Sequence, residues 1–220
     1  MKIIKIDFVS DVACPWCAVG LGALGTALKN LEGEVQAEIH FQPFELNPQM
    51  PQGGEDTFEH LMNKYGMPKE QIEASQKQIR ERAAAVGFPF SENIRPRIYN
   101  TFNCHRLLHW AGIELGEQAQ YALKNELLVS NFRLGDNLDD HDALLGAVQR
   151  AGLDVKRASQ VLNSDEFESE VRQIQAQFRD LGITAVPSII FNNKHLLQGG
   201  QPVEMFEQAI RQISQSEDSV

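Results

Sequence analysis

The sequence predicts an α/β fold in which a long helical segment interrupts a small unit of strands and helices. Near the N-terminus, a short β-branched segment leads directly into a helix that begins with Cys14-Pro15-Trp16-Cys17. Near the C-terminus, Pro187 stands at the entry of another strand, and the chain between these points is helical in pattern. The expected order is β-α-β, many helices, then β-β-α.

The N-terminal unit follows from its residue pattern. Residues 2–9 are rich in β-branched side chains, and the Ser10-Asp11 pair after them is typical of a helix start. Over 14–31, leucines three and four residues apart predict a helix with one buried face. A second strand is expected over 35–44, and the breaker residues of 47–54 indicate a loop.

The middle of the chain carries repeated helix signals. Asp56 and Glu59 have the spacing of a capping box, and Pro68 opens a further helix that Gly87 ends. Asp139 and Asp142 are expected to cap another helix. Further helices are predicted over 101–111, 118–132 and 165–181, the last with an apolar stripe formed by Phe167, Val171, Ile174, Phe178 and Leu181.

The C-terminal segment returns to strands. Residues 188–191 and 194–197 flank Asn192-Asn193, which predicts a hairpin with a two-residue turn. A last helix is expected over 203–213, followed by a frayed polar tail over 214–220.

Composition and charge bear on the expected partners and location of the protein. The 220 residues carry a net charge of −10, which repels phosphates, so neither nucleic acid nor a membrane surface is an expected partner. No segment approaches the roughly 18 apolar residues of a transmembrane helix. The three cysteines are too few for a disulfide framework. Because the N-terminus also lacks a continuous apolar leader, we expect a reducing, cytoplasmic location.

The strongest chemical signal is the pair Cys14 and Cys17 at a helix start. Sulfurs three residues apart on the first turn lie on one face, and the free N–H groups and positive end of the helix favour a thiolate. We therefore expect Cys14, nearer the helix end, to be the nucleophile and Cys17 to be the resolving thiol. Pro15 suits the first turn, where its missing N–H would have no helical acceptor, and Trp16 completes the motif.

A second signal is Pro187, because a central strand normally rejects proline. A cis Val186–Pro187 bond would turn the chain sharply and present the Val186 backbone beside Cys14 for pairing with a substrate peptide. Val186 and Pro187 are therefore expected to position the substrate.

These blocks resemble the thioredoxin superfamily and, within it, the DsbA-like proteins of the FrnE type. The similarity covers nearly the whole chain and includes Asp11 to Cys17, Phe44 to Pro48, Asn100 to Arg106, Gly182 to Pro187 and Gly199 to Pro202. It implies a thioredoxin-like core, residues 1–50 and 182–215, with a large all-helical insertion domain over 55–165 that roofs the cysteines. The amphipathic helix over 165–181 would connect the two.

The resemblance also implies disulfide exchange with protein or low-molecular-weight thiols and disulfides. It implies no metal or other cofactor, although glutathione could serve as a co-substrate. Related kappa-class glutathione transferases and 2-hydroxychromene-2-carboxylate isomerases typically have serine where this chain has Cys14, so a protein disulfide oxidoreductase is favoured. A glutathione-dependent transferase or isomerase, in which Cys14 activates a bound thiol, is the alternative, and monomer or homodimer stays open.

The dipeptide between the cysteines bears on the redox potential. Because Pro15-Trp16 lacks the histidine of DsbA itself, one source of thiolate stabilisation is missing. We expect a potential nearer that of thioredoxin, roughly −270 mV, than that of DsbA, about −120 mV.

Other interpretations compete with this one. Cys14 and Cys17 could form a zinc site with Cys104 and His105, although a helix start is unlike a zinc knuckle.

A lone cysteine among leucines is usually a buried hydrophobe, so Cys104 is expected to be structural, or else a third thiol near the pair. The resemblance places His105 near the cysteines, whereas His105 and His109 alone make an incomplete metal site. The non-enzymatic alternative is a redox-regulated binding module or holdase.

Overall fold

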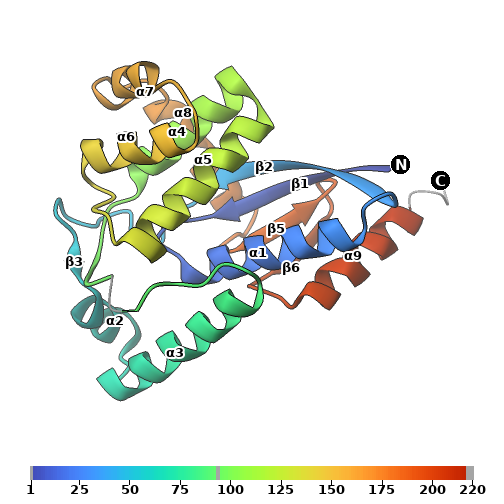
Figure 1. Cartoon of the computed structure of the whole chain (residues 1–220), viewed down its shortest axis with the longest axis horizontal. Coiled ribbons are helices and arrows are strands. Elements are labelled where there is room, and N and C mark those ends of the chain that lie inside the picture. The colour runs from blue at the N-terminus through green and yellow to red at the C-terminus, as the bar shows by residue number, and fades with distance from the viewer. Residues whose placement is uncertain (1, 93–94, 217–220) are drawn as a thin grey trace.

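The structure, a computed structural model, describes residues 2–92 and 95–216 and is built around one four-stranded sheet (Figure 1). Strand β1 (Lys2–Ser10) pairs in parallel with β2 (Val35–Pro43) and antiparallel with β5 (Ser188–Phe191). Strand β6 (His195–Gln198) pairs antiparallel with β5 and completes the order β2-β1-β5-β6. Because elements cover both faces of the sheet, β1 is buried from its fifth residue to its end.

Helices surround this sheet. Helix α1 (Pro15–Asn30) follows β1, and α9 (Val203–Ser216) packs beside it (Figure 1). Between β2 and β5 the chain forms α2 (Thr57–Tyr65), α3 (Lys69–Ala85), α4 (Phe102–Trp110), α5 (Glu117–Val129), α6 (His141–Arg150), α7 (Val155–Leu162) and α8 (Glu168–Asp180). Two π-helical turns, Ala111–Leu115 and Ser130–Leu134, follow α4 and α5. This arrangement confirms a thioredoxin-like core with a large helical insertion.

The helical segment differs from expectation at several points. Asp140, and not Asp139, caps α6, because its carboxylate accepts the Asp142 N–H at 3.3 Å. Strands β3 (Glu55–Asp56) and β4 (Arg97–Ile98) pair inside the segment, so it is not entirely helical. Helix α7 lies where the pattern predicted no separate helix.

Helix α8, the hairpin and the last helix also differ from their predicted bounds. Helix α8 begins only after Phe167, whose φ is 63°, and Leu181 is 73% exposed and so does not belong to a buried stripe. Asn192 and Asn193 both have positive φ, as expected, but pairing resumes only at His195, so the hairpin loop has three residues. Helix α9 continues to Ser216, and residues 217–220 of the predicted tail lie outside the described residues.

The edge strand β2 is covered by α5. The Gln120 side-chain amide accepts the Phe41 N–H at 2.9 Å and donates to the Phe41 carbonyl at 3.2 Å, as a neighbouring strand would. The same amide donates to the Leu108 carbonyl at 3.1 Å. A Cβ at Gly112 would lie 2.8 Å from Gln120 Nε2, so glycine leaves room for this contact. Gln120 therefore fixes the start of α5 against the sheet edge.

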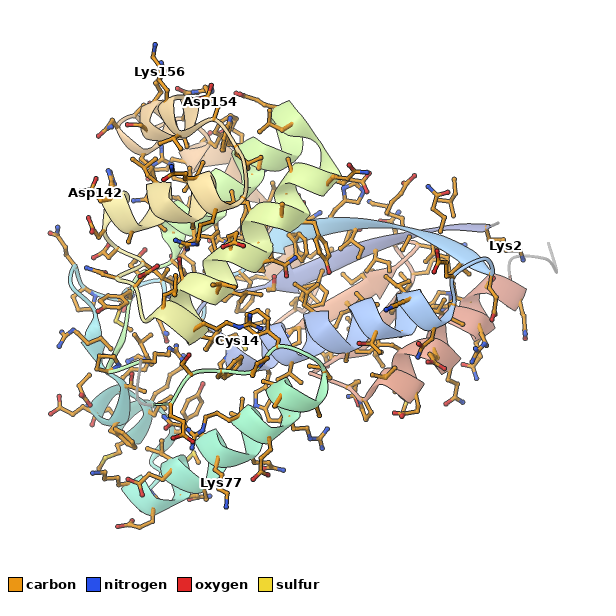
Figure 2. All side chains as sticks on the ribbon, in the orientation of Figure 1. Lys2, Cys14, Lys77, Asp142, Asp154 and Lys156 are labelled. Carbon is orange, nitrogen blue, oxygen red and sulfur yellow. The ribbon has the colours of Figure 1, made fainter. Side chains whose placement is uncertain are left out.

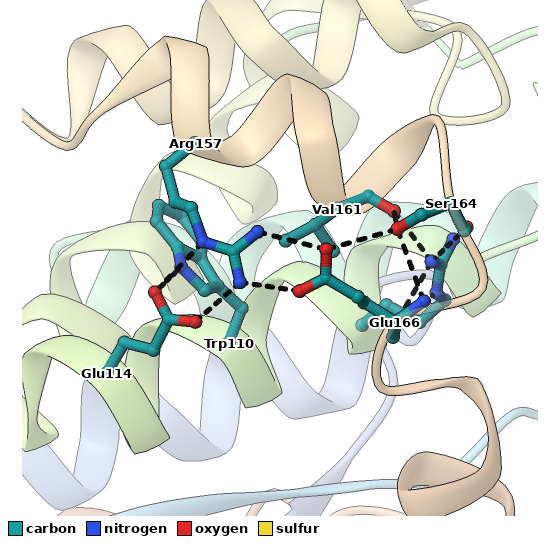
Figure 3. A network of polar contacts seen from close by, with 7 residues as sticks. Trp110, Glu114, Arg157, Val161, Ser164 and Glu166 are labelled. Carbon is teal, nitrogen blue, oxygen red and sulfur yellow. Dashed lines mark hydrogen bonds and ion pairs between the residues drawn. The ribbon is translucent and has the colours of Figure 1, made fainter.

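A polar network ties α7 to the turn after α4 (Figure 3). Arg157 donates to Glu114 and to Glu166 at 2.6 Å each, and Glu114 also accepts the Trp110 indole N–H at 2.8 Å. Among the helices within the described ranges, none is long and apolar enough to cross a bilayer.

Candidate active site

Cys14 occupies the start of α1, in the middle of the molecule (Figure 2). It is the N-cap residue, Pro15 takes the first helical position, and no side chain caps the first turn. Pro15 has no N–H, the Cys17 N–H donates to the Cys14 carbonyl at 3.1 Å, and the backbone N–H groups of Trp16 and Cys17 also act on the Cys14 sulfur. Cys14 and Cys17 are free thiols, 4% and 0% exposed.

The two thiols differ in acidity. A hydrogen bond from the Cys17 thiol is the main cause that lowers the pKa of Cys14, and the backbone N–H groups of Cys17 and Trp16 add to it. Burial is the main cause that raises the pKa of Cys17 well above that of an ordinary thiol, and its hydrogen bond to Cys14 adds to the rise. In the reduced pair Cys14 therefore supplies the thiolate while Cys17 keeps its proton.

The segment around Pro187 lies directly across from Cys14. The Val186–Pro187 peptide bond is cis, the isomer that the sequence analysis expects. The Cys14 sulfur lies 3.6 Å from the Val186 carbonyl oxygen. Gly20 of α1 allows this approach, because a Cβ there would lie 3.2 Å from Pro187 Cγ. Two segments far apart in the sequence thus meet at the thiol.

An open hollow adjoins this junction. It has a volume of about 460 Å³ and is lined by Trp16, Arg82, Val186 and residues 199–202. The Trp16 ring packs on the backbone of Gly200, where a Cβ would lie only 3.0 Å from the ring. Because Trp16 and Val186 both line it, the hollow adjoins the two segments that meet at Cys14, while Cys14 itself is not part of its lining.

A second cavity, of about 230 Å³, adjoins Pro15. Its lining includes Phe58, Phe90, Phe132, Arg80 and Arg95. Arg95 donates to the Ala13 carbonyl at 2.7 Å, whereas its buried Nε has no hydrogen-bond partner within the described ranges. Burial lowers the pKa of Arg95 to about 10, against the opposing charges of Cys14 and Asp11, so it remains a cation at neutral pH. The cavity suits a ligand that carries an anionic group.

Asp11 organises the turn that precedes Cys14. Its carboxylate is 1% exposed and accepts the N–H groups of Ala13 at 3.1 Å and Leu46 at 2.8 Å. His105 Nε2 lies 3.6 Å from Asp11 Oδ1. Burial alone would raise the Asp11 pKa, but the His105 ring and the two backbone N–H groups hold that pKa below its usual value. Asp11 therefore stays ionised and holds the turn in place.

Lys124 of α5 adds a buried cation. The side chain is 1% exposed, and its Nζ has no hydrogen-bond partner among the residues that the structure describes. Nζ lies 5.6 Å from the centroid of the Phe41 ring. Burial lowers the pKa of Lys124, while negative charge on Cys17 and then Asp11 raises it. Reciprocally, the Lys124 charge lowers the pKa of Cys17.

The structure thus brings Cys14 and Cys17 together with Val186 and Pro187, and it places His105 against Asp11 in the turn before Cys14. Local pattern did not predict Asp11, Arg95 or Lys124 as site residues. Lys124 could have been found, because it follows Leu123 and precedes Leu127 on the buried side of a predicted helix, where a lysine is out of place.

The Cys104 thiol is buried on α4. It is 0% exposed, its sulfur lies 4.0 Å from the Leu138 carbonyl, and burial raises its pKa far above the ordinary value. Within the described part of the chain, the metal-ligating group of three or more that the geometry brings together is Glu38, His40 and Glu117, and it contains no cysteine. Within these residues the cysteines and His105 therefore do not form the group of ligands that the zinc alternative requires.

This chain is similar to known proteins over nearly its whole length. The model of the DSBA-like thioredoxin domain family matches residues 5–211. The uncharacterized protein YwbO of Bacillus subtilis is 26% identical over 208 residues, which cover 94% of this chain and 96% of that protein. The crystal structure of a probable DsbA oxidoreductase from Streptomyces coelicolor superposes with a TM-score of 0.86 at 31% identity, covering 97% of this chain and 91% of that one. A 2-hydroxychromene-2-carboxylate isomerase shares the fold, with a TM-score of 0.70 at 16% identity, covering 98% of this chain and 99% of that one.

Proposed function

Because the chain belongs to the DSBA-like thioredoxin domain family, we propose that it is a thiol-disulfide oxidoreductase of the FrnE type that acts through Cys14 and Cys17. One observation carries the proposal. Two thiols on one helical turn have pKa values displaced in opposite directions, and the more acidic one lies against the carbonyl of a cis X-Pro bond. A nucleophile and a resolving group need this difference in acidity.

The proposed reaction begins with attack of the Cys14 thiolate on a substrate disulfide. The substrate S–S bond breaks, a disulfide forms between Cys14 and one substrate sulfur, and the other sulfur leaves as a thiolate that takes a proton from solvent. Cys17 then loses its proton and attacks the Cys14 sulfur, which releases the second substrate thiolate. The substrate gains two electrons, and the enzyme ends as the Cys14–Cys17 disulfide.

Each neighbouring group has a part in this sequence. The Val186 backbone offers strand-like pairing to a substrate peptide in the hollow beside Trp16. The Lys124 charge favours the Cys17 thiolate in the second step, when Cys17 must ionise in a buried position. A low-molecular-weight thiol or a second dithiol protein would restore the reduced pair.

The setting of this activity is part of the proposal. A cytoplasmic location fits a chain with three cysteines, and proteins or small molecules that carry thiols or disulfides are the proposed partners. The lack of a cofactor requirement, the lack of nucleic-acid or membrane partners, and a monomeric or homodimeric state stay predictions.

The decisive test uses two single variants. We expect insulin reduction by wild type and its loss in Cys14→Ser, because the nucleophile is gone. We expect Cys17→Ser to accumulate mixed disulfides with protein substrates, because the resolving step is blocked. Full insulin reduction by Cys14→Ser would contradict the proposal, whereas no reduction by the wild type would favour a binding module or holdase.

The cavity beside Pro15 supports a second candidate, a glutathione-dependent transferase or isomerase. Its cationic Arg95 and aromatic walls suit a small thiol that carries carboxylates, held near Cys14. In that case Cys17 is incidental, and Cys17→Ser keeps its full glutathione-dependent turnover. A large loss of turnover in Cys17→Ser would exclude this candidate.

A further inference from the structure

Three potential metal ligands lie together on the edge of the sheet, in a group that contains neither cysteine of the pair. Glu38 and His40 are two residues apart on β2, so their side chains leave the same face of the strand. Glu117 is the first residue of α5. One ligand atom from each side chain lies within 4.8 Å of the others, and His40 Nε2 lies 3.9 Å from Glu117 Oε1.

The backbone holds these three residues in place. Two of them share one strand, and the third begins the helix that Gln120 fastens to the same strand. The Gln120 amide makes both of its bonds to the Phe41 backbone, one residue beyond His40. The three ligands are therefore positioned by the fold, and only their side-chain rotations remain free.

The charges of the group are unbalanced. Glu38 and Glu117 bring two negative charges together, and no lysine or arginine within the described ranges forms an ion pair with either of them. His40 is the only ion-pair partner of Glu117 there, at a distance too long for a hydrogen bond. A divalent cation between the three side chains would neutralise both carboxylates.

Space for further ligands lies beside the group. A cavity of about 380 Å³ is lined by residues that include His40, Gln42, His109, Glu117 and Gln120. The His40 and Glu117 side chains are 35% and 41% exposed, so an ion can enter from solvent. Water or a small ligand in the cavity could complete the coordination of an ion held by three protein groups.

We propose that Glu38, His40 and Glu117 bind one divalent transition-metal ion, with Zn²⁺ as the best-fitting ion. One imidazole and two carboxylates suit zinc, whereas calcium and magnesium prefer oxygen ligands alone. Two ligands of a tetrahedral zinc ion lie roughly 3.4 Å apart. The 3.9 Å between His40 and Glu117 therefore closes with a small side-chain rotation. The site does not depend on the proposed disulfide exchange.

The test is calorimetric titration of Zn²⁺ into the full chain with Cys14→Ser and Cys17→Ser, which removes both thiols of the proposed redox pair as competing ligands. Cys104 remains, but it is 0% exposed. We expect one ion per chain at pH 7.5. Adding His40→Ala or Glu117→Gln should weaken binding at least about tenfold.

The matched control is His60→Ala in the same background. His60 Nδ1 lies 2.6 Å from Glu55 Oε2, so it is another histidine–carboxylate pair, but no third ligand joins it within the described ranges. We expect this variant to bind zinc as tightly as its parent. The proposal is overturned if the parent binds no zinc, if His40→Ala binds as tightly as the parent while circular dichroism shows both folded, or if His60→Ala loses as much affinity as His40→Ala.

Discussion

The buried charges around the cysteine pair and those of the helical segment are satisfied to very different degrees. Arg106, on α4, is 4% exposed and donates to the carbonyls of Val161, Ser164 and Glu166 at distances from 2.5 to 3.0 Å. Lys124, on α5, is equally buried and has no hydrogen-bond partner for its Nζ in the described part of the chain. Arg95 and His105, also beside the pair, each have one buried nitrogen without a hydrogen-bond partner in the same ranges, although His105 Nε2 lies 3.6 Å from Asp11.

The hydrogen-bonded charges of the helical segment stabilise the fold, whereas the charges beside the cysteine pair act on the thiols. Buried charges that are fully hydrogen-bonded hold elements together, whereas a buried charge without partners costs free energy and remains only where another gain offsets it. Near Cys14 and Cys17 that gain is control of thiol ionisation. Substitutions in the two regions should therefore act on different properties.

The largest effect on stability is expected for Arg106→Met. The variant leaves buried carbonyls without a donor, so the free energy of unfolding should fall by about 3 kcal/mol. The rate of disulfide exchange by the folded fraction should stay within about twofold of wild type. Urea denaturation measures the free energy of unfolding, and insulin reduction measures the exchange rate. A large loss of exchange by the folded protein would contradict the separation between charges that stabilise the fold and charges that act on the thiols.

Asp11→Asn should have the next largest effect, and the effect should depend on pH. The folded-state pKa of Asp11 is lowered, so its carboxylate stabilises the fold fully above the unfolded value of about 4, and this stabilisation is lost as the pH falls through the folded pKa. We expect the variant to lose about 1–2 kcal/mol at pH 7 and less at pH 3. Urea denaturation across this range checks the slope, and an equal loss at both pH values would refute this role of the charge.

Lys124→Met should change the reaction of the thiols more than the stability of the fold. Replacing an unpartnered buried ammonium by an apolar side chain of similar length should leave stability unchanged or raise it. The lifetime of the Cys14 mixed disulfide should increase on the order of tenfold, because Cys17 ionises less readily without the nearby cation. Stopped-flow decay of a model mixed disulfide measures this, with Lys156→Met on the exposed start of α7 as the control. If Lys124→Met is destabilised and still resolves the mixed disulfide at the wild-type rate, this role of Lys124 is refuted.

Arg157→Gln should have the smallest effect. Its partners Glu114 and Glu166 are 35% and 42% exposed, so water screens both ion pairs despite their short distances. We expect the Tm to change by no more than about 2 °C and the exchange rate to stay the same. A large fall in Tm by scanning calorimetry would show that the network in Figure 3 behaves like the buried Arg106 cluster.

Much of this molecule could be predicted from sequence because its signals are local. The strand before Cys14, the helix after it and the strand entry at Pro187 each follow from short patterns, and the resemblance joins them into one fold. The start of α6 could not be predicted, because the capping residue depends on which of several neighbouring aspartates meets the helix. The start of α8 could not be predicted either, because Phe167 takes a left-handed backbone conformation there. Exposure of Leu181 was also missed, since periodicity alone does not show where a helix leaves the core.

The charged shell of the site escaped prediction for a different reason. Asp11, Arg95 and Lys124 come from a loop, an irregular segment and a helix that are distant in sequence, and only the fold brings their charges to the thiols. A lysine among the leucines of a predicted helix, Lys124, was the one local sign of this arrangement.

The most direct test of the account is the pH dependence of iodoacetamide alkylation of the reduced protein, with the modified cysteine identified by mass spectrometry. We expect Cys14 to react first, with a midpoint below the value of about 8.5 for an ordinary thiol, while Cys17 and Cys104 stay unmodified. Modification of Cys17 or Cys104 before Cys14, or an ordinary midpoint for Cys14, would contradict the proposed division of labour between the two thiols.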